Sequence, residues 1–175
     1  MKLRFPAVAI LFALFCAGSL AAQSTPELLP ADKLAKLLPP RVFLDGENVP
    51  TQERNASGIY LGEHKLAIVS LIDTAGYSSA YQEKYSGVIM TQGSLQIGSQ
   101  TLHPGQYGLG QKKSGSGDSA TVTLEIYDLG GNHLGEVSTE RDAEVKPRPE
   151  QIVIEKDGTA RLYLGRYYTT IAAGK

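Results

Sequence analysis

Alternating apolar and polar residues mark the clearest strand of this chain. Between residues 120 and 127, Ala120, Val122, Leu124 and Ile126 alternate with residues that carry polar groups. Because successive side chains of a strand point to opposite faces, this pattern predicts a strand with one face buried. Nearly all of residues 66–72 are apolar, which is typical of a strand covered on both faces.

Turn residues between apolar runs predict further strands and their pairing. Gly130, Gly131 and Asn132 favour a tight reversal after the first strand, so residues 134–137 are expected to return beside it. Asp157 and Gly158 separate residues 151–155 from 160–164 and predict a second hairpin. The short runs 88–90, 95–97 and 107–109 predict three more strands, and the Gly- and Ser-rich residues 110–119 predict a flexible connection.

Leucine spacing and a capping serine predict two short helices. Residues 31–38 hold Leu34, Leu37 and Leu38 at helical spacing inside a lead-in segment, 23–40, that contains prolines at both ends of the leucine run. A helix this short is unstable alone, so it either docks its leucines on the domain or frays. Residues 78–85 predict the second helix, with Ser78 or Ser79 as its cap.

Together these elements predict a mostly β fold in a single domain, residues 41–175. We expect an antiparallel β-sandwich, with a jelly-roll-like arrangement or a barrel as alternatives, plus a short N-terminal helix and one short inserted helix. Parallel sheets are not expected, because each parallel pair needs a long crossover connection and the chain has no room for several.

The first 22 residues have the pattern of a secretory signal peptide. Lys2 and Arg4 precede about a dozen apolar residues, and the segment ends at Ala21 and Ala22. The apolar run is too short to span a membrane. Because a bulky residue, Phe15, comes directly before Cys16, lipid attachment is not expected. The segment predicts export to the bacterial periplasm or the extracellular space, with no membrane span.

Removing this segment changes the composition. Cys16 is the single cysteine, so the remaining chain can form neither disulfides nor thiolate metal sites. The full chain has 17 basic and 18 acidic residues, and without Lys2 and Arg4 the net charge is −3. The basic residues are scattered along the sequence, so nucleic acid is not expected as a partner.

Residues 95–109 resemble a pattern, Ile-x-Gly-x-x-Leu-x-Pro-Gly-x-Tyr, that occurs in uncharacterised exported bacterial β-sandwich proteins of unknown function. In this chain the segment includes Gly98, Leu102, Pro104, Gly105 and Tyr107. The resemblance extends over most of the chain after residue 22. It implies a sandwich, and it implies no activity.

Groups able to carry chemistry are dispersed along the sequence. His64, His103 and His133 are far apart and have no partners at metal-ligand spacing, so no metal site and no cofactor are expected. Asp73 ends a buried strand and Asp128 begins a turn, but no nucleophile motif accompanies them. No catalytic residue is assigned.

Tyrosines give the strongest binding hypothesis, since the chain has nine Tyr and no Trp. Tyr77, Tyr81 and Tyr85 are spaced four apart and would share one face of a helix. Their rings, with Asp73 nearby in the sequence, could stack on a sugar or peptide. The competing interpretation is that they anchor the helix on the sheet. A second cluster contains Tyr163, Tyr167 and Tyr168.

The resulting functional hypothesis is an exported, non-catalytic binding or cell-envelope interaction module. Its ligand is unknown, with a glycan or an envelope protein as the possible partners. The alternative is a secreted hydrolase whose carboxylates are brought together by the fold, with Asp73 and Asp128 as the candidates.

Overall fold

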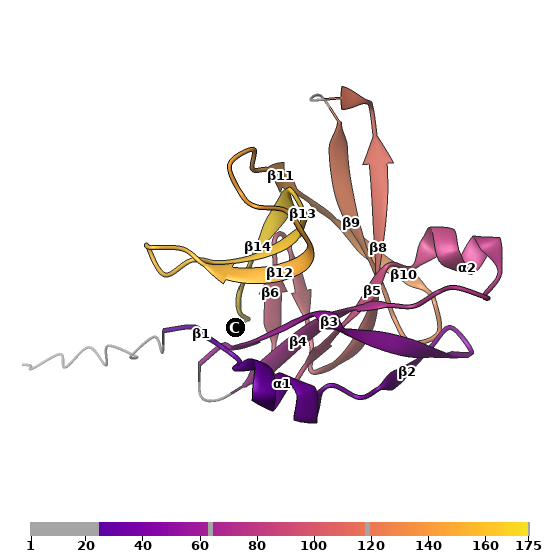
Figure 1. Cartoon of the computed structure of the whole chain (residues 1–175), viewed down its shortest axis with the longest axis horizontal. Helices are drawn as coiled ribbons and strands as arrows, with labels where there is room; N and C mark the ends of the chain where they lie inside the picture. The colour runs from indigo at the N-terminus through magenta and orange to yellow at the C-terminus, as the bar shows by residue number, and fades with distance from the viewer. Residues whose placement is uncertain (1–24, 63–64, 118–119, 175) are drawn as a thin grey trace, which may run out of the picture.

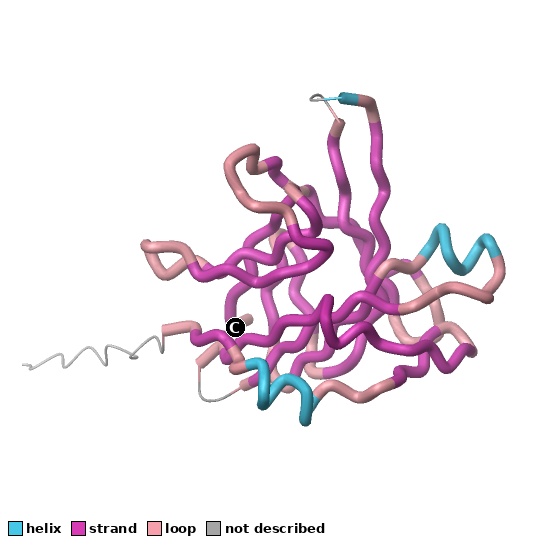
Figure 2. The backbone as a smooth tube through the Cα atoms, in the orientation of Figure 1, coloured by secondary structure: helices cyan, strands magenta, loops and turns pink. Residues whose placement is uncertain are grey.

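The computed structural model describes residues 25–62, 65–117 and 120–174, so the predicted signal peptide lies outside the described residues. Within them the strands form two antiparallel sheets that pack face to face, which confirms the predicted β-sandwich (Figure 1). Two short helices lie at the periphery of the strands (Figure 2).

The larger sheet has eight strands, one of which is attached at its side. Its order is β1 (Glu27–Leu28), β3 (Glu47–Tyr60), β4 (Leu66–Ile72), β5 (Gly87–Thr91), β8 (Gly105–Ser114), β9 (Thr121–Tyr127) and β10 (His133–Ser138), with β2 (Arg41–Leu44) paired to β3. The hairpin predicted at Gly130 to Asn132 is confirmed as the turn between β9 and β10.

The smaller sheet has six strands and is assembled from two separate parts of the chain. Its order is β12 (Arg148–Ile154), β13 (Ala160–Gly165), β14 (Tyr167–Ala173), β6 (Leu95–Ile97) and β7 (Gln100–Leu102), with β11 (Glu140–Arg141) paired to β14. The hairpin predicted at Asp157 and Gly158 is confirmed between β12 and β13. Strands β6 and β7 leave the larger sheet after β5 and return to it at β8.

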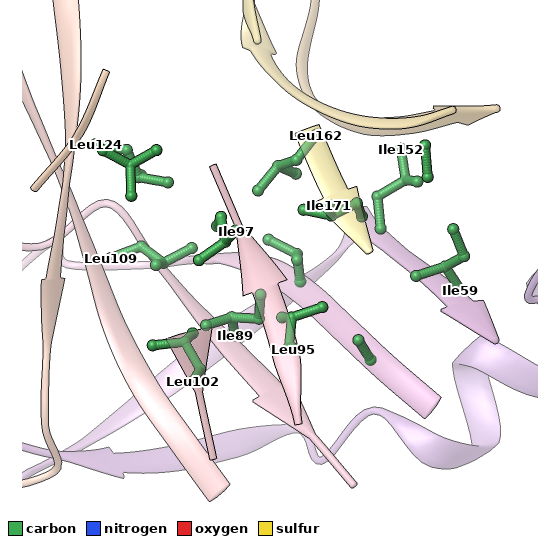
Figure 3. Packing of buried hydrophobic residues seen from close by; sticks show 14 of the residues in the cluster. Ile59, Ile89, Leu95, Ile97, Leu102, Leu109, Leu124, Ile152, Leu162 and Ile171 are labelled. Carbon is green, nitrogen blue, oxygen red and sulfur yellow. The ribbon is translucent and has the colours of Figure 1, made fainter. Parts of the chain in front are cut away.

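The main core lies between the two sheets. Figure 3 shows residues from both, including Ile59 and Leu109 of the larger sheet and Ile97 and Leu162 of the smaller one. All four side chains are at most 1% exposed. Successive side chains of a strand point to opposite faces of the sheet, and these residues point to the inner face. Each strand predicted to be half-buried therefore contributes the apolar side chains of one face to the core.

Both helices cover the outer face of the larger sheet, which explains why β4 is apolar at nearly every position. Helix α1 (Ala31–Leu37) docks Leu34 in a cluster with Leu38, Leu66 and Ile68, so the docked alternative holds. Leu37, also expected to dock, is 49% exposed. Helix α2 (Ser79–Lys84) begins after Ser78, whose hydroxyl accepts a hydrogen bond from the Tyr81 backbone N–H as predicted.

Two regions differ from the sequence expectation. Residues 110–114, expected in a flexible connection, continue β8 and pair with β9 as far as Ser114 and Thr121. Strand β3 was not expected, because Pro50 and several polar residues interrupt any alternation there. In both cases backbone hydrogen bonds to a neighbouring strand maintain the strand although the side chains do not predict it.

Candidate functional site

The predicted tyrosine stripe exists as a continuous row of rings, but the three residues do not share one helix. Only Tyr81 lies within α2, since Tyr77 precedes the helix and Tyr85 follows it. The centroids of Tyr77 and Tyr81 are 5.2 Å apart and those of Tyr81 and Tyr85 are 4.7 Å apart. The row packs against the outer face of the larger sheet with Leu44, Val49 and Val88. Tyr81 and Tyr85 are 7% and 2% exposed, so little of either ring faces solvent.

The hydroxyl groups of this row bind the hairpin formed by β2 and β3. Tyr77 donates to the Asn48 carbonyl at 2.8 Å, and Tyr81 donates to the Leu44 carbonyl at 3.1 Å. Tyr85 donates to Asp45 Oδ2 at 3.0 Å, and burial followed by this bond raises the pKa of Tyr85. These contacts fix α2 to the sheet; a ligand role for the three tyrosines stays a prediction.

The row is longer than the sequence indicated, because Tyr127 and His133 extend it across β9 and β10. Tyr127 lies 5.2 Å from Tyr85 and 5.3 Å from His133, both edge to face. The Lys84 ammonium is 4.9 Å and 5.0 Å from the ring centroids of Tyr85 and Tyr127. Burial, followed by a hydrogen bond to Glu125, raises the pKa of Tyr127 to about 12.

The two aspartates proposed for hydrolysis each hold a turn. Asp73 is exposed, and its Oδ1 accepts a 3.0 Å hydrogen bond from the Ala75 backbone N–H. Asp128 accepts one hydrogen bond from the backbone N–H of Asn132 and one from the Asn132 side-chain amide. The bond from the side-chain amide does most to lower the pKa of Asp128. These contacts are the usual role of Asp in a turn, and they give neither residue a catalytic partner.

The second tyrosine cluster is divided by strand alternation. Tyr163 and Tyr168 pair on the outer face of the smaller sheet, with ring centroids 5.2 Å apart, and Arg161 lies 4.3 Å from the Tyr168 ring centroid. Tyr163 also donates a hydrogen bond to Asp142 at 3.0 Å. Tyr167 points to the opposite face, where it borders a cleft.

The β8–β9 hairpin extends beyond the core (Figure 1). Residues of this hairpin and of the smaller sheet line the cleft. Its volume is about 500 Å³. Buried Val122 and Leu164 contribute apolar surface, and the Tyr167 hydroxyl donates to the Ala120 carbonyl at 3.2 Å. The lining residues are Gln111, Lys113, Gly117, Val122, Arg141, Pro147, Pro149, Leu164, Gly165, Arg166 and Tyr167.

Three cations and no carboxylate belong to this lining: Lys113, Arg141 and Arg166. Lys113 lies four residues beyond buried Leu109 on the same face of β8, and Arg141 pairs with Tyr167 across β11 and β14. Arg166 donates hydrogen bonds to the backbone carbonyls of Ala143 and Val145. Both acceptors are neutral, so these two bonds do not neutralise the charge of Arg166. The cleft therefore favours a ligand with negative charge.

A second cavity of about 530 Å³ lies beside the beginning of β13 and the end of β14. Lys65 is the one charged residue among those that line it, and backbone from Ala172 to Gly174 forms much of its wall. With one charged residue in its lining, this cavity indicates the chemistry of a ligand less clearly than the cationic cleft does.

Sequence reasoning missed the cationic cleft because its lining comes from separate strands. Lys113, Arg141 and Arg166 are far apart along the chain, and only the packing of the two sheets brings them together. The one local signal was the change from apolar to basic residues on one face of β8, from Leu109 to Lys113.

Comparison with known proteins gives no match to a family model, a curated protein or a solved structure. Neither of the two described helices is long and apolar enough to cross a membrane.

Proposed function

We propose that this protein is an exported, non-catalytic binding module whose ligand is an acidic glycan. The observation that carries the proposal is the cleft of about 500 Å³ that Lys113 and Arg166 line, with no carboxylate among its described lining residues. A pocket of this size accommodates a ligand of several hundred daltons. Export is supported by the signal-peptide pattern of residues 1–22.

A sugar fits the uncharged part of this cleft. The Tyr167 ring is half-buried, and Pro147 and Pro149 are exposed beside it, so flat apolar surface lies next to the three cations. Rings of this kind contact the apolar faces of sugars, while guanidinium groups bind carboxylates in pairs of hydrogen bonds. An acidic glycan presents both features in each repeating unit.

The competing hydrolase hypothesis receives less support. Its carboxylates, Asp73 and Asp128, are engaged in turns with Ala75 and Asn132. An envelope protein with an acidic surface remains the other candidate partner for the same cleft.

Calorimetric titration with oligogalacturonate, and with a neutral galactose oligomer of equal length, tests the proposal. We expect the acidic oligomer alone to bind, and binding to weaken as the salt concentration rises, because ions screen exposed charges. The double variant K113Q/R141Q should weaken binding about five- to thirtyfold, since exposed charge pairs contribute about 0.5–1 kcal/mol each and two are removed.

The matched control is K33Q/K36Q, which removes two exposed cations from α1, outside the cleft. Its affinity should equal that of the natural sequence. Equal binding of the neutral oligomer, equal losses in both double variants, or hydrolysis of a chromogenic glycoside without binding of the acidic oligomer would each contradict the proposal.

A further inference from the structure

Three metal-ligating side chains converge on the β9–β10 hairpin, apart from the residues that line the cationic cleft. One ligand atom from each of Glu125, His133 and Glu136 lies within 4.8 Å of the other two. Glu125 is half-buried, and the other two side chains are exposed to solvent. Small rotations of the two exposed side chains would let a single ion contact all three groups at about 2.0–2.2 Å.

The register of the two strands produces this arrangement. Glu136 lies directly opposite Glu125, so both carboxylates project from the same face of the sheet. The register shifts between His133 and Gly135, and His133 pairs with Tyr127, two residues from Glu125. The irregularity therefore adds an imidazole to the carboxylate pair.

Facing carboxylates repel each other unless a cation or a proton lies between them. The cation on the neighbouring helix, Lys84, is engaged elsewhere: its ammonium donates to Asp45 at 3.0 Å and to the Gly131 carbonyl at 2.7 Å. A bound metal ion would convert the repulsion between Glu125 and Glu136 into attraction to a shared charge.

Tyr127 holds two of the three ligands in place. Its hydroxyl donates to Glu125 Oε2 at 2.7 Å, and its ring lies 5.3 Å from the His133 ring in an edge-to-face contact. Groups that orient metal ligands in this way raise the affinity of a site. Tyr127 is itself buried, so its position is set by the aromatic row behind it.

We propose that Glu125, His133 and Glu136 bind one divalent transition-metal ion of the Zn²⁺ and Cu²⁺ class. The imidazole favours these ions over Ca²⁺ and Mg²⁺, which prefer sets of oxygen ligands. Three protein ligands leave at least one coordination position for water or for a carboxylate of a partner. This site is independent of the proposed glycan cleft, because the two share no residue.

Titration of the tag-free protein with Zn²⁺ and Cu²⁺ tests the site by two readouts. Calorimetry should give one equivalent per chain for each ion. Because the chain has no Trp, its emission comes from tyrosine, and Cu²⁺ should quench the Tyr127 contribution in the same titration. Ca²⁺ should give neither signal.

The variants H133A and E136Q should each weaken Zn²⁺ binding at least about tenfold. Both side chains are exposed, and unchanged circular dichroism without metal will show that the variants fold. H103A and H64A are the matched controls, since they remove the other two histidines, and each should bind within twofold of the natural sequence.

Two results would overturn the proposal. One is the absence of heat and quenching up to about 1 mM Zn²⁺ or Cu²⁺. The other is an affinity that H133A and E136Q leave unchanged, which would place the bound ion elsewhere on the protein.

Discussion

Glu150 is the most unusual titratable residue of the described chain, because its carboxyl group lies between the two sheets. Glu150 is 4% exposed. Ser57 Oγ donates a hydrogen bond to Glu150 Oε1, and Glu150 Oε2 has no hydrogen-bond partner among the described residues. Burial raises the pKa of Glu150 to about 8, and the Ser57 bond opposes this only in part. Glu150 is therefore protonated in the folded protein at neutral pH.

This carboxyl group should make stability fall between about pH 4.5 and pH 8. In that window the unfolded chain has lost the proton and the folded chain keeps it, so rising pH favours unfolding by up to about 1.4 kcal/mol per pH unit. The variant E150Q should flatten this dependence and be more stable than the natural sequence at pH 8, as measured by urea unfolding from pH 4 to 9. The control E53Q, at an exposed position, should keep the original slope.

Gly131 occupies a position that excludes a larger side chain for two reasons. Its φ is +82°, and an added Cβ would lie 2.4 Å from the Asp45 carboxyl carbon. Asp45 also holds Lys84 and Tyr85, so the glycine allows the β9–β10 turn to lie against this polar group.

The variant G131A should lower the free energy of unfolding by about 2–4 kcal/mol, because backbone strain and a collision add together. Gly158 provides the matched control, with a φ of +85° and open space around it. G158A should cost about 1 kcal/mol, the strain alone. Equal losses of stability in chemical unfolding would show that the contact with Asp45 relaxes without cost.

At the scale of elements, α1 shows how little surface a short helix needs in order to dock. It has seven residues and contributes one buried residue, Leu34, which joins Leu38, Leu66 and Ile68 in a cluster on the outer face of the larger sheet. A helix of two turns gains its stability from such contacts rather than from its own hydrogen bonds.

Replacing Leu34 with Ala should therefore lower the unfolding free energy by about 2–3 kcal/mol, by removing the main contact of α1. L37A is the matched control, because Leu37 belongs to the same helix and is 49% exposed; it should change stability by less than about 0.5 kcal/mol. Thermal unfolding of both variants measures the difference. A similar loss for both would mean that helix propensity, not docking, sets the stability of this segment.

For the whole molecule, the sequence predicted those features whose signal is local. The alternation of apolar and polar residues predicted strands with one buried face, such as the strand that contains Ile126. Turn residues predicted the hairpins, such as the one at Gly158. The sandwich followed from their number. Strand β3 escaped prediction because Pro50 and its polar neighbours are held by pairing with strands on both sides.

Features that depend on distant segments could not be predicted. Tyr77, Tyr81 and Tyr85 were found as a stripe, but their burial depends on β2 and β3, and their continuation to His133 depends on β9 and β10. The carboxylates of Glu125 and Glu136 lie eleven residues apart, a separation that means nothing until the hairpin register is known.

The excursion of β6 and β7 into the smaller sheet has a consequence for biosynthesis. Strand β6 pairs with the end of β14, where Leu95 meets Ala173, so its partner is made after all the other described strands. A chain emerging from the ribosome cannot complete the smaller sheet or close the core over Leu95 and Ile97 until β14 is available. Late closure of the core delays stable folding, which is what the proposed export would require of the chain.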